Sequence, residues 1–243
     1  MLSMSILKGY ITWLVVLSLV LPLGLLTDPA LGSNASTTGV SYYYAGYCLY
    51  GPPHEVWGLG GVMGNIYTIC PSIPIWSPGY RHFCEWVTII LKYSPRFYWI
   101  QLGYVKGTTY PWDFYLEIVD ENGRRLEFCE PADPVPGVTY RYKIMYYGGS
   151  KYEAEIWIGL DRVWWIAREV NPYVGKDLQA MVETCYSVGL EPDICIDGSH
   201  FSKLQYIWFY EWEWYYWYTH VTAEDRPYKV EEVSDHEFYA LGP

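Results

Sequence analysis

Apolar and aromatic residues recur along this chain in short runs that alternate with polar residues every second position, and the 3.6-residue repeat of a helix is almost absent. Gly, Pro, Asn and Asp separate the runs, as is typical of turns between strands. This pattern predicts an all-β fold. The predicted strands cover residues 40–49, 55–64, 66–70, 86–93, 97–105, 112–119, 124–129, 138–147, 151–160, 163–170, 178–186, 204–218 and 228–233.

Two tight turns join predicted neighbours, one at Glu121-Asn122-Gly123 and one at Gly148-Gly149. So many strands in one chain favour a two-sheet antiparallel sandwich of the jelly-roll type. The aromatic run 204–218 is read either as one bent strand or as two strands. As a strand it would place Trp212, Trp214 and Tyr216 on one face.

The first 32 residues have the layout of a secretory signal peptide: Lys8, an apolar run over 11–26, and then Ala30-Leu31-Gly32. The run is too short for a typical membrane-spanning helix, which needs about 20 apolar residues. We therefore expect an exported protein without a membrane partner after signal cleavage, whose residues 33–243 form a single β-sandwich domain. A retained membrane anchor is the alternative.

Charge and cysteine content narrow the possible functions. The formal net charge is −11, which disfavours a nucleic-acid partner. The six cysteines all follow the predicted signal peptide, and an exported protein with an even number of cysteines favours disulfides. The pair expected first is Cys185 with Cys195, which would close a short loop. The histidines and cysteines do not have zinc-site spacing, and no phosphate or dinucleotide motif occurs, so no metal and no cofactor are expected.

Three polar side chains stand at mid-strand positions, where a desolvated group must find a hydrogen-bond partner. Gln101 shares a strand face with Trp99 and with Gly103, whose missing side chain would leave room beside the amide. Glu117 and Glu183 occupy similar positions in two other predicted strands. If all three point into one groove, an amide donor and an acid would face the same space.

At these residues the chain resembles the eqolisin-type glutamic peptidases. The resemblance rests on the order of short pieces between about Tyr42 and Thr184: YYYAGY, GGVMGNIYTICPS, EWVTI, WIQLGY, WDFYLEIV, GVTYRYKI and QAMVET. It implies a secreted, concanavalin-like jelly-roll sandwich that cuts polypeptides in acid. The catalytic glutamine would be Gln101 and the catalytic glutamate Glu183, with Glu117, Trp86 and Trp99 in supporting positions.

Carried over in this way, Glu183 would take a proton from water and return it to the leaving amine, and the Gln101 side-chain NH₂ would stabilise the oxyanion. The sequence departs from the family at Val105, at 89–91 and at 180–182, where the family has acidic or aromatic residues. These departures leave open a relative that keeps the fold and has lost the chemistry.

A second class of function is a non-catalytic exported module that binds a surface glycan. Sugar faces stack on exposed aromatic rings, and the dense aromatic run supplies such rings. The candidate platform is Trp212, Trp214 and Tyr216, together with Trp208, Tyr215 and Trp217. The same rings could instead fill the core, and a cell-surface subunit that pairs through its sheet edges is a third alternative.

Overall fold

The computed structural model describes residues 39–50, 58–73, 79–92, 97–129, 133–171 and 174–243. The predicted signal peptide and the start near Ser33 lie outside these residues, as does the beginning of the strand predicted at 55–64. Every regular element within them is a β-strand. The prediction of an all-β fold is therefore confirmed.

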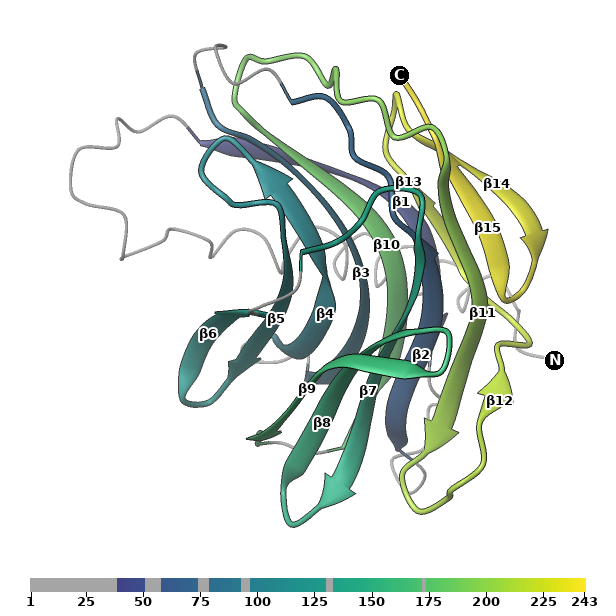
Figure 1. Ribbon diagram of the computed structural model, residues 1–243. Coiled ribbons are helices and arrows are strands. Elements are labelled where there is room, and N and C mark those ends of the chain that lie inside the picture. Colours follow the sequence, from purple (N-terminus) through teal and green to yellow (C-terminus); the bar gives the residue numbers. More distant parts are fainter. Residues whose placement is uncertain (1–38, 51–57, 74–78, 93–96, 130–132, 172–173) are drawn as a thin grey trace, which may run out of the picture.

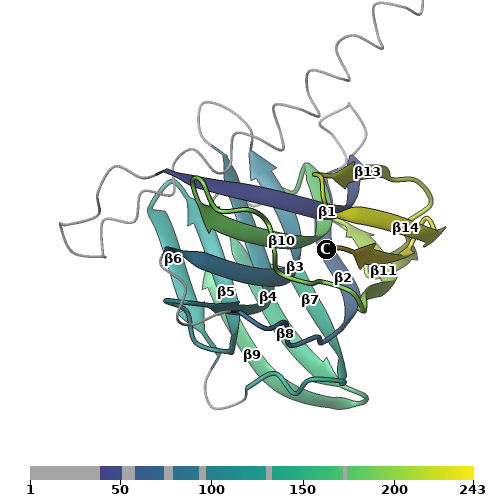
Figure 2. The ribbon, with the colours of Figure 1, turned by 90° about the horizontal axis from the view of Figure 1, so that it is seen from above.

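Two antiparallel sheets pack face to face, which confirms the predicted sandwich (Figures 1 and 2). The seven-stranded sheet has the order β13 (Val221–Glu224), β1 (Val40–Tyr50), β10 (Asp177–Ser187), β3 (Arg81–Lys92), β4 (Tyr98–Gly107), β5 (Asp113–Asp120), β6 (Gly123–Phe128). The eight-stranded sheet has the order β14 (Lys229–Ser234), β15 (Glu237–Leu241), β11 (Ser199–Trp208), β2 (Leu59–Tyr67), β7 (Thr139–Gly148), β8 (Lys151–Ile158), β9 (Asp161–Glu169). Its eighth strand, β12 (Tyr215–Tyr216), pairs with β11 outside this order.

The core lies between the sheets and is rich in aromatic side chains. Tyr47, Tyr104, Tyr142 and Phe83 are fully buried there, with aliphatic residues from both sheets. Buried tyrosines need partners for their hydroxyl groups. Tyr186 and Tyr228 supply them for each other, with their oxygens 2.6 Å apart.

Both predicted tight turns are present, because β5 and β6 flank residues 121–122 and β7 and β8 flank residues 149–150. The two short strands predicted at 55–64 and 66–70 are instead one strand, β2. The short strands β13 and β15 were not predicted. β13 is the edge strand of the seven-stranded sheet, and β15 lies between β14 and β11 in the eight-stranded sheet.

The aromatic run 204–218 is neither one long strand nor two strands of similar length. β11 ends at Trp208, the chain turns at Phe209 and Tyr210, and the two-residue strand β12 (Tyr215–Tyr216) pairs back onto β11. The backbone N–H of Trp217 donates to the carbonyl of Leu204, and the Trp217 side chain is only 1% exposed. The turn therefore sends Trp217 into the core and leaves the residues before it on the surface.

Candidate functional site

The first candidate site is the outer face of the seven-stranded sheet, which is the face turned away from the eight-stranded sheet. Side chains at every second position of a strand lie on this face, and register fixes which residues stand side by side. One row across the sheet contains Gln179, Thr88, Gln101 and Glu117. A row further along contains Tyr44, Glu183, Cys84 and Val105. Gln101, Glu117 and Glu183 therefore share one face.

Gln101 lies in the middle of β4 and is partly exposed. Its side-chain Nε2 donates a hydrogen bond of 2.5 Å to the hydroxyl of Tyr115 on β5. Burial holds the pKa of Tyr115 well above its ordinary value, and the neighbouring Cys84 and Glu183 raise it further. The phenol is therefore neutral and accepts the amide N–H. The amide keeps its second N–H and its carbonyl for another partner.

Glu117 is buried directly across from Gln101 and forms an ion pair with Arg124 of β6. It also accepts a hydrogen bond of 3.3 Å from the indole Nε1 of Trp99. Glu117 and Trp99 are therefore hydrogen-bond partners of each other. A carboxylate with a guanidinium and an indole donor is well satisfied.

Glu183 belongs to a different group of side chains, on β10 and β3. Its Oε1 lies 3.0 Å from Nε2 of His82, and Nδ1 of His82 lies 2.7 Å from the hydroxyl of Tyr80. Cys84 stands directly across from Glu183 in the register. Burial raises the pKa of the Cys84 thiol well above its ordinary value, and the Glu183 carboxylate adds to this effect.

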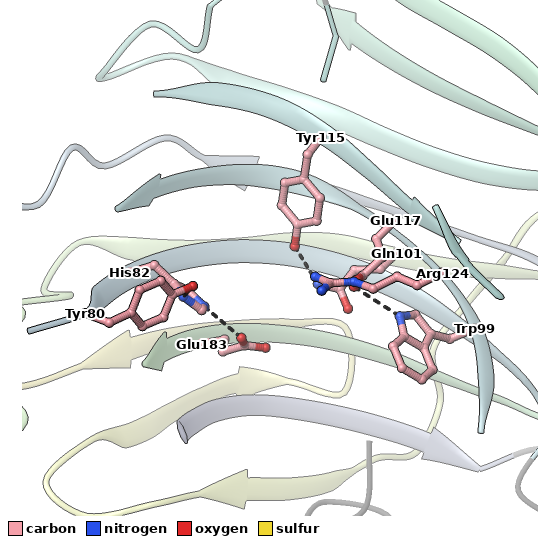
Figure 3. Close-up of polar contacts among 8 residues, drawn as sticks. All are labelled: Tyr80, His82, Trp99, Gln101, Tyr115, Glu117, Arg124 and Glu183. Carbon is pink, nitrogen blue, oxygen red and sulfur yellow. Dashed lines mark hydrogen bonds and ion pairs between the residues drawn. The ribbon is translucent and has the colours of Figure 1, made fainter. Parts of the chain in front are cut away.

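Gln101 and Glu183 lie on the same face but are not brought together. Two strand spacings and four residues of register separate them, which places their Cα atoms about 16 Å apart. The row between them carries Trp86. Figure 3 shows two separate groups, one around Glu183 and His82 and one around Gln101, Glu117 and Trp99. In this conformation one water molecule does not bridge the amide and the acid.

The predicted disulfide between Cys185 and Cys195 is wrong, because both are free thiols. Cys185 is buried on the outer face of β10, whereas Cys195 is exposed. Tyr186, which follows Cys185 in the chain, points to the inner side of the sheet and accepts a 2.9 Å hydrogen bond from the backbone N–H of Ile194. The segment with Cys195 therefore lies on the side of β10 opposite to the Cys185 thiol.

The second candidate site is a pocket at the end of the eight-stranded sheet where β2 begins and β7 and β11 end. Its volume is about 230 Å³. Six aromatic side chains line it: Tyr146, Tyr147, Trp208, Phe209, Tyr210 and Trp212. Trp212 is 79% exposed and Tyr210 is 75% exposed, so these rings are open to solvent.

The glycan platform expected from the sequence is thus divided by the structure. Trp208 and Trp212 line the pocket, whereas Trp217 is buried in the core. Tyr216 lies beside His236, with ring centroids 4.7 Å apart, and Tyr215 packs against Tyr206. Trp214 is half-buried and does not line the pocket. Sequence reasoning missed Tyr146 and Tyr147, because they come from a distant strand end.

Sequence reasoning also missed His82 and Cys84 as partners of Glu183. The ligand atoms of His82, Cys84 and Glu183 lie within 4.8 Å of one another, although no metal site was expected from their linear spacing. A signal was present in the two short patterns His82-Phe83-Cys84 and Glu183-Thr184-Cys185, which place polar ligands at alternate positions of two strands. Only the pairing of β3 with β10 makes them neighbours.

Within the described residues, no helix reaches the length and apolar character required to cross a membrane. No family model matches the sequence, and no curated protein matches it.

Comparison with solved structures shows likeness to glutamic peptidases. Scytalido-glutamic peptidase with a peptide-based transition-state analogue aligns with a TM-score of 0.56 and 11% identity, over 84% of this chain and 100% of that chain. SCP-B, a member of the eqolisin family in complex with the tripeptide Ala-Ile-His, gives a TM-score of 0.55 and 10% identity, with the same coverage. A family 16 endo-glucanase from Bacteroides ovatus aligns at a TM-score of 0.31 and 9% identity, over 64% of this chain and 70% of that chain. At these identities the eqolisin resemblance holds for the fold.

Proposed function

We propose that this protein is an exported module that binds a glycan in its aromatic pocket. The observation that carries the proposal is the pocket of about 230 Å³ lined by six aromatic side chains, two of them largely exposed. Export rests on the signal peptide predicted at residues 1–32.

The chemistry of the lining suits a sugar ring. Aromatic faces offer flat apolar area to the C–H faces of a pyranose, and hydroxyl and indole groups at ring edges bind its hydroxyl groups. The Glu211 side chain adds a hydrogen-bond acceptor to the lining. Small-molecule sites usually have volumes of about 300–1,000 Å³, so this smaller pocket fits one sugar unit of a longer chain.

Trp212→Ala is expected to weaken glycan binding at least about tenfold. Truncating an exposed central ring typically costs more than about 1.4 kcal/mol of binding free energy, and that amount is a factor of ten in affinity. The measurement is isothermal titration calorimetry with soluble polysaccharides, after a panel has identified one that binds the wild-type protein.

Trp165→Ala is the matched control, because Trp165 is 46% exposed on β9 and does not line the pocket. It should bind like the wild type. If no polysaccharide binds the wild-type protein, or if both variants lose affinity equally, the pocket is not a glycan site.

The outer face of the seven-stranded sheet supports a second candidate, acid hydrolysis of a polypeptide by Gln101 and Glu183. Buried polar atoms without a partner are rare in native proteins and point to a ligand that would satisfy them. Three such atoms lie on this face. Thr88 Oγ1 is in the row of Gln101, Tyr44 Oη is in the row of Glu183, and Trp86 Nε1 is in the row between them. A peptide backbone lying across these rows would reach these atoms after the side chains that cover them move aside.

This mechanism requires the two side chains to move toward each other, so that the scissile carbonyl and the attacking water fit between them. Gln101 would donate its remaining amide N–H to the oxyanion, and Glu183 would leave His82 and take the proton from water. The gap between the side chains makes this the weaker of the two candidates.

Digestion of a denatured protein at acid pH tests the second candidate. Gln101→Ala should lower kcat/KM by about 100 to 1,000-fold, because that is the usual cost of losing one oxyanion donor. Glu183→Gln should abolish activity without changing the size of the side chain. Gln205→Ala, on β11 of the other sheet, is the control and should leave activity intact. Equal activity in all three variants would exclude the Gln/Glu mechanism.

A further inference from the structure

We propose that His82, Cys84 and Glu183 bind a zinc ion on the outer face of the seven-stranded sheet. This site goes beyond glycan binding and uses residues on the sheet opposite to the aromatic pocket. It also assigns Glu183 a role other than the general base of a peptidase.

Cross-strand pairing assembles the ligands in a compact block. His82 and Cys84 alternate along β3, and Glu183 and Cys185 alternate along β10. In the register Cys84 faces Glu183 and His82 faces Cys185, so all four side chains lie on one face. Both strands are central in the sheet, with hydrogen-bonded neighbours on each side. Rigid strands of this kind hold ligands more precisely than loops do.

The distances are close to those of an occupied site. The ligand atoms of His82, Cys84 and Glu183 lie within 4.8 Å of one another, and Nε2 of His82 lies 3.0 Å from Oε1 of Glu183. Tetrahedral zinc with bonds of about 2.0–2.3 Å needs ligand atoms about 3.3–3.8 Å apart. Small torsions of the Cys84 and Glu183 side chains bring the three atoms onto one ion.

The second shell has the arrangement that a zinc-bound histidine needs. Nδ1 of His82 lies 2.7 Å from the Tyr80 hydroxyl, which leaves Nε2 toward Cys84 and Glu183. A tyrosine hydroxyl both donates and accepts. Without metal, Nδ1 is the ring nitrogen that faces Tyr80 and Nε2 is the one that faces Glu183. With metal, the proton stands on Nδ1 and is donated to Tyr80, and the Nε2 lone pair binds zinc.

Zinc also fits the charge and donor types. Imidazole, thiolate and carboxylate are its usual ligands, and one thiolate with one carboxylate neutralises its charge in a buried place. Binding releases the Cys84 thiol proton. Three protein ligands leave a fourth position for water.

Cobalt(II) titration of the chelator-treated full chain tests the site, because a cobalt–thiolate bond gives a near-ultraviolet charge-transfer band that no other ligand here produces. The wild-type protein should show the band, and added zinc should remove it by displacing cobalt. Cys84→Ser should lose the band. Glu183→Gln should keep the band with an affinity lower by more than about 100-fold, since even a second-shell change costs about 10 to 100-fold.

Two further variants separate a metal site from a packing role. Tyr80→Phe should keep the band and weaken cobalt binding by about 10 to 100-fold, because it removes only the Nδ1 partner. Cys48→Ser is the matched control, since Cys48 is also buried on this face, opposite Gln179, and should bind cobalt like the wild type. Absence of the band in the wild-type protein, or its persistence in a folded Cys84→Ser variant, would overturn the proposal.

Discussion

Glu85→Gln is expected to remove a pH dependence of about 4 kcal/mol from the free energy of unfolding between pH 4.5 and pH 8. Glu85 lies in the middle of β3 and points into the core between the sheets, where it has no exposed surface. The hydroxyl of Tyr104 donates a hydrogen bond to it, and the backbone N–H of Ile69 donates to Tyr104 at 3.0 Å. Burial raises the pKa of Glu85 from 4.5 to about 8, although the hydrogen bond from Tyr104 and the nearby Ser199 hydroxyl partly oppose the shift.

The sign follows from proton binding in the two states. Between pH 4.5 and pH 8 the folded protein holds a proton on Glu85 and the unfolded chain does not, so raising the pH favours unfolding. The contribution of Glu85 to the free energy of unfolding is fully present below about pH 4.5 and is lost by about pH 8. Glutamine stays neutral at every pH, so the variant lacks this loss.

Urea denaturation at several pH values measures the effect as the difference between the wild-type protein and the variant. The difference should grow in favour of Glu85→Gln as the pH rises. Glu231→Gln, on the exposed side of β14, controls for removal of a carboxylate and should follow the wild-type curve. Parallel curves for all three proteins would mean that Glu85 is ionised in the folded state.

The pattern of apolar residues was sufficient to predict the fold class and most strands of the sandwich. Period two and turn residues are local features, and strands such as β4, β5 and β8 follow them closely. The run 204–218 could not be divided in the same way, because its aromatic residues occupy both faces of an alternating pattern. The turn at Phe209 and Tyr210 contains no Gly, Pro, Asn or Asp to mark it.

The candidate site shows where local pattern stops being informative. Alternation correctly places Gln101, Glu117 and Glu183 at mid-strand positions that share a face, since parity within a strand is fixed by the pleat. Register between strands depends on packing of the whole sheet. That register pairs Glu183 with Cys84 and pairs Gln101 with Thr88, so the amide and the acid stand four residues apart.

Gly103 also shows that local sequence pattern does not determine how neighbouring strands pack. The sequence suggested that its missing side chain leaves open room beside Gln101. In the structure Trp86 and the backbone of β3 occupy that room. A Cβ atom built on Gly103 would lie 2.0 Å from the carbonyl oxygen of Glu85 and 2.8 Å from Cβ of Trp86. The glycine thus permits close approach of two central strands and does not form the floor of a groove.

Gly103→Ala is therefore expected to destabilise the protein by more than about 3 kcal/mol, which is large for the addition of one methyl group. The atom that the new Cβ meets first belongs to the backbone of β3, so a side-chain rotation does not relieve the overlap and the β3–β4 ladder must shift. For a chain of this size the loss corresponds to a fall in Tm of roughly 6–12 °C, measurable by calorimetry. Gly39→Ala is the matched control, because its Cβ would meet only a side-chain atom of Val188 at an ordinary 3.5 Å. An equal and small change in Tm for both variants would show that β3 and β4 are not packed this closely at Gly103.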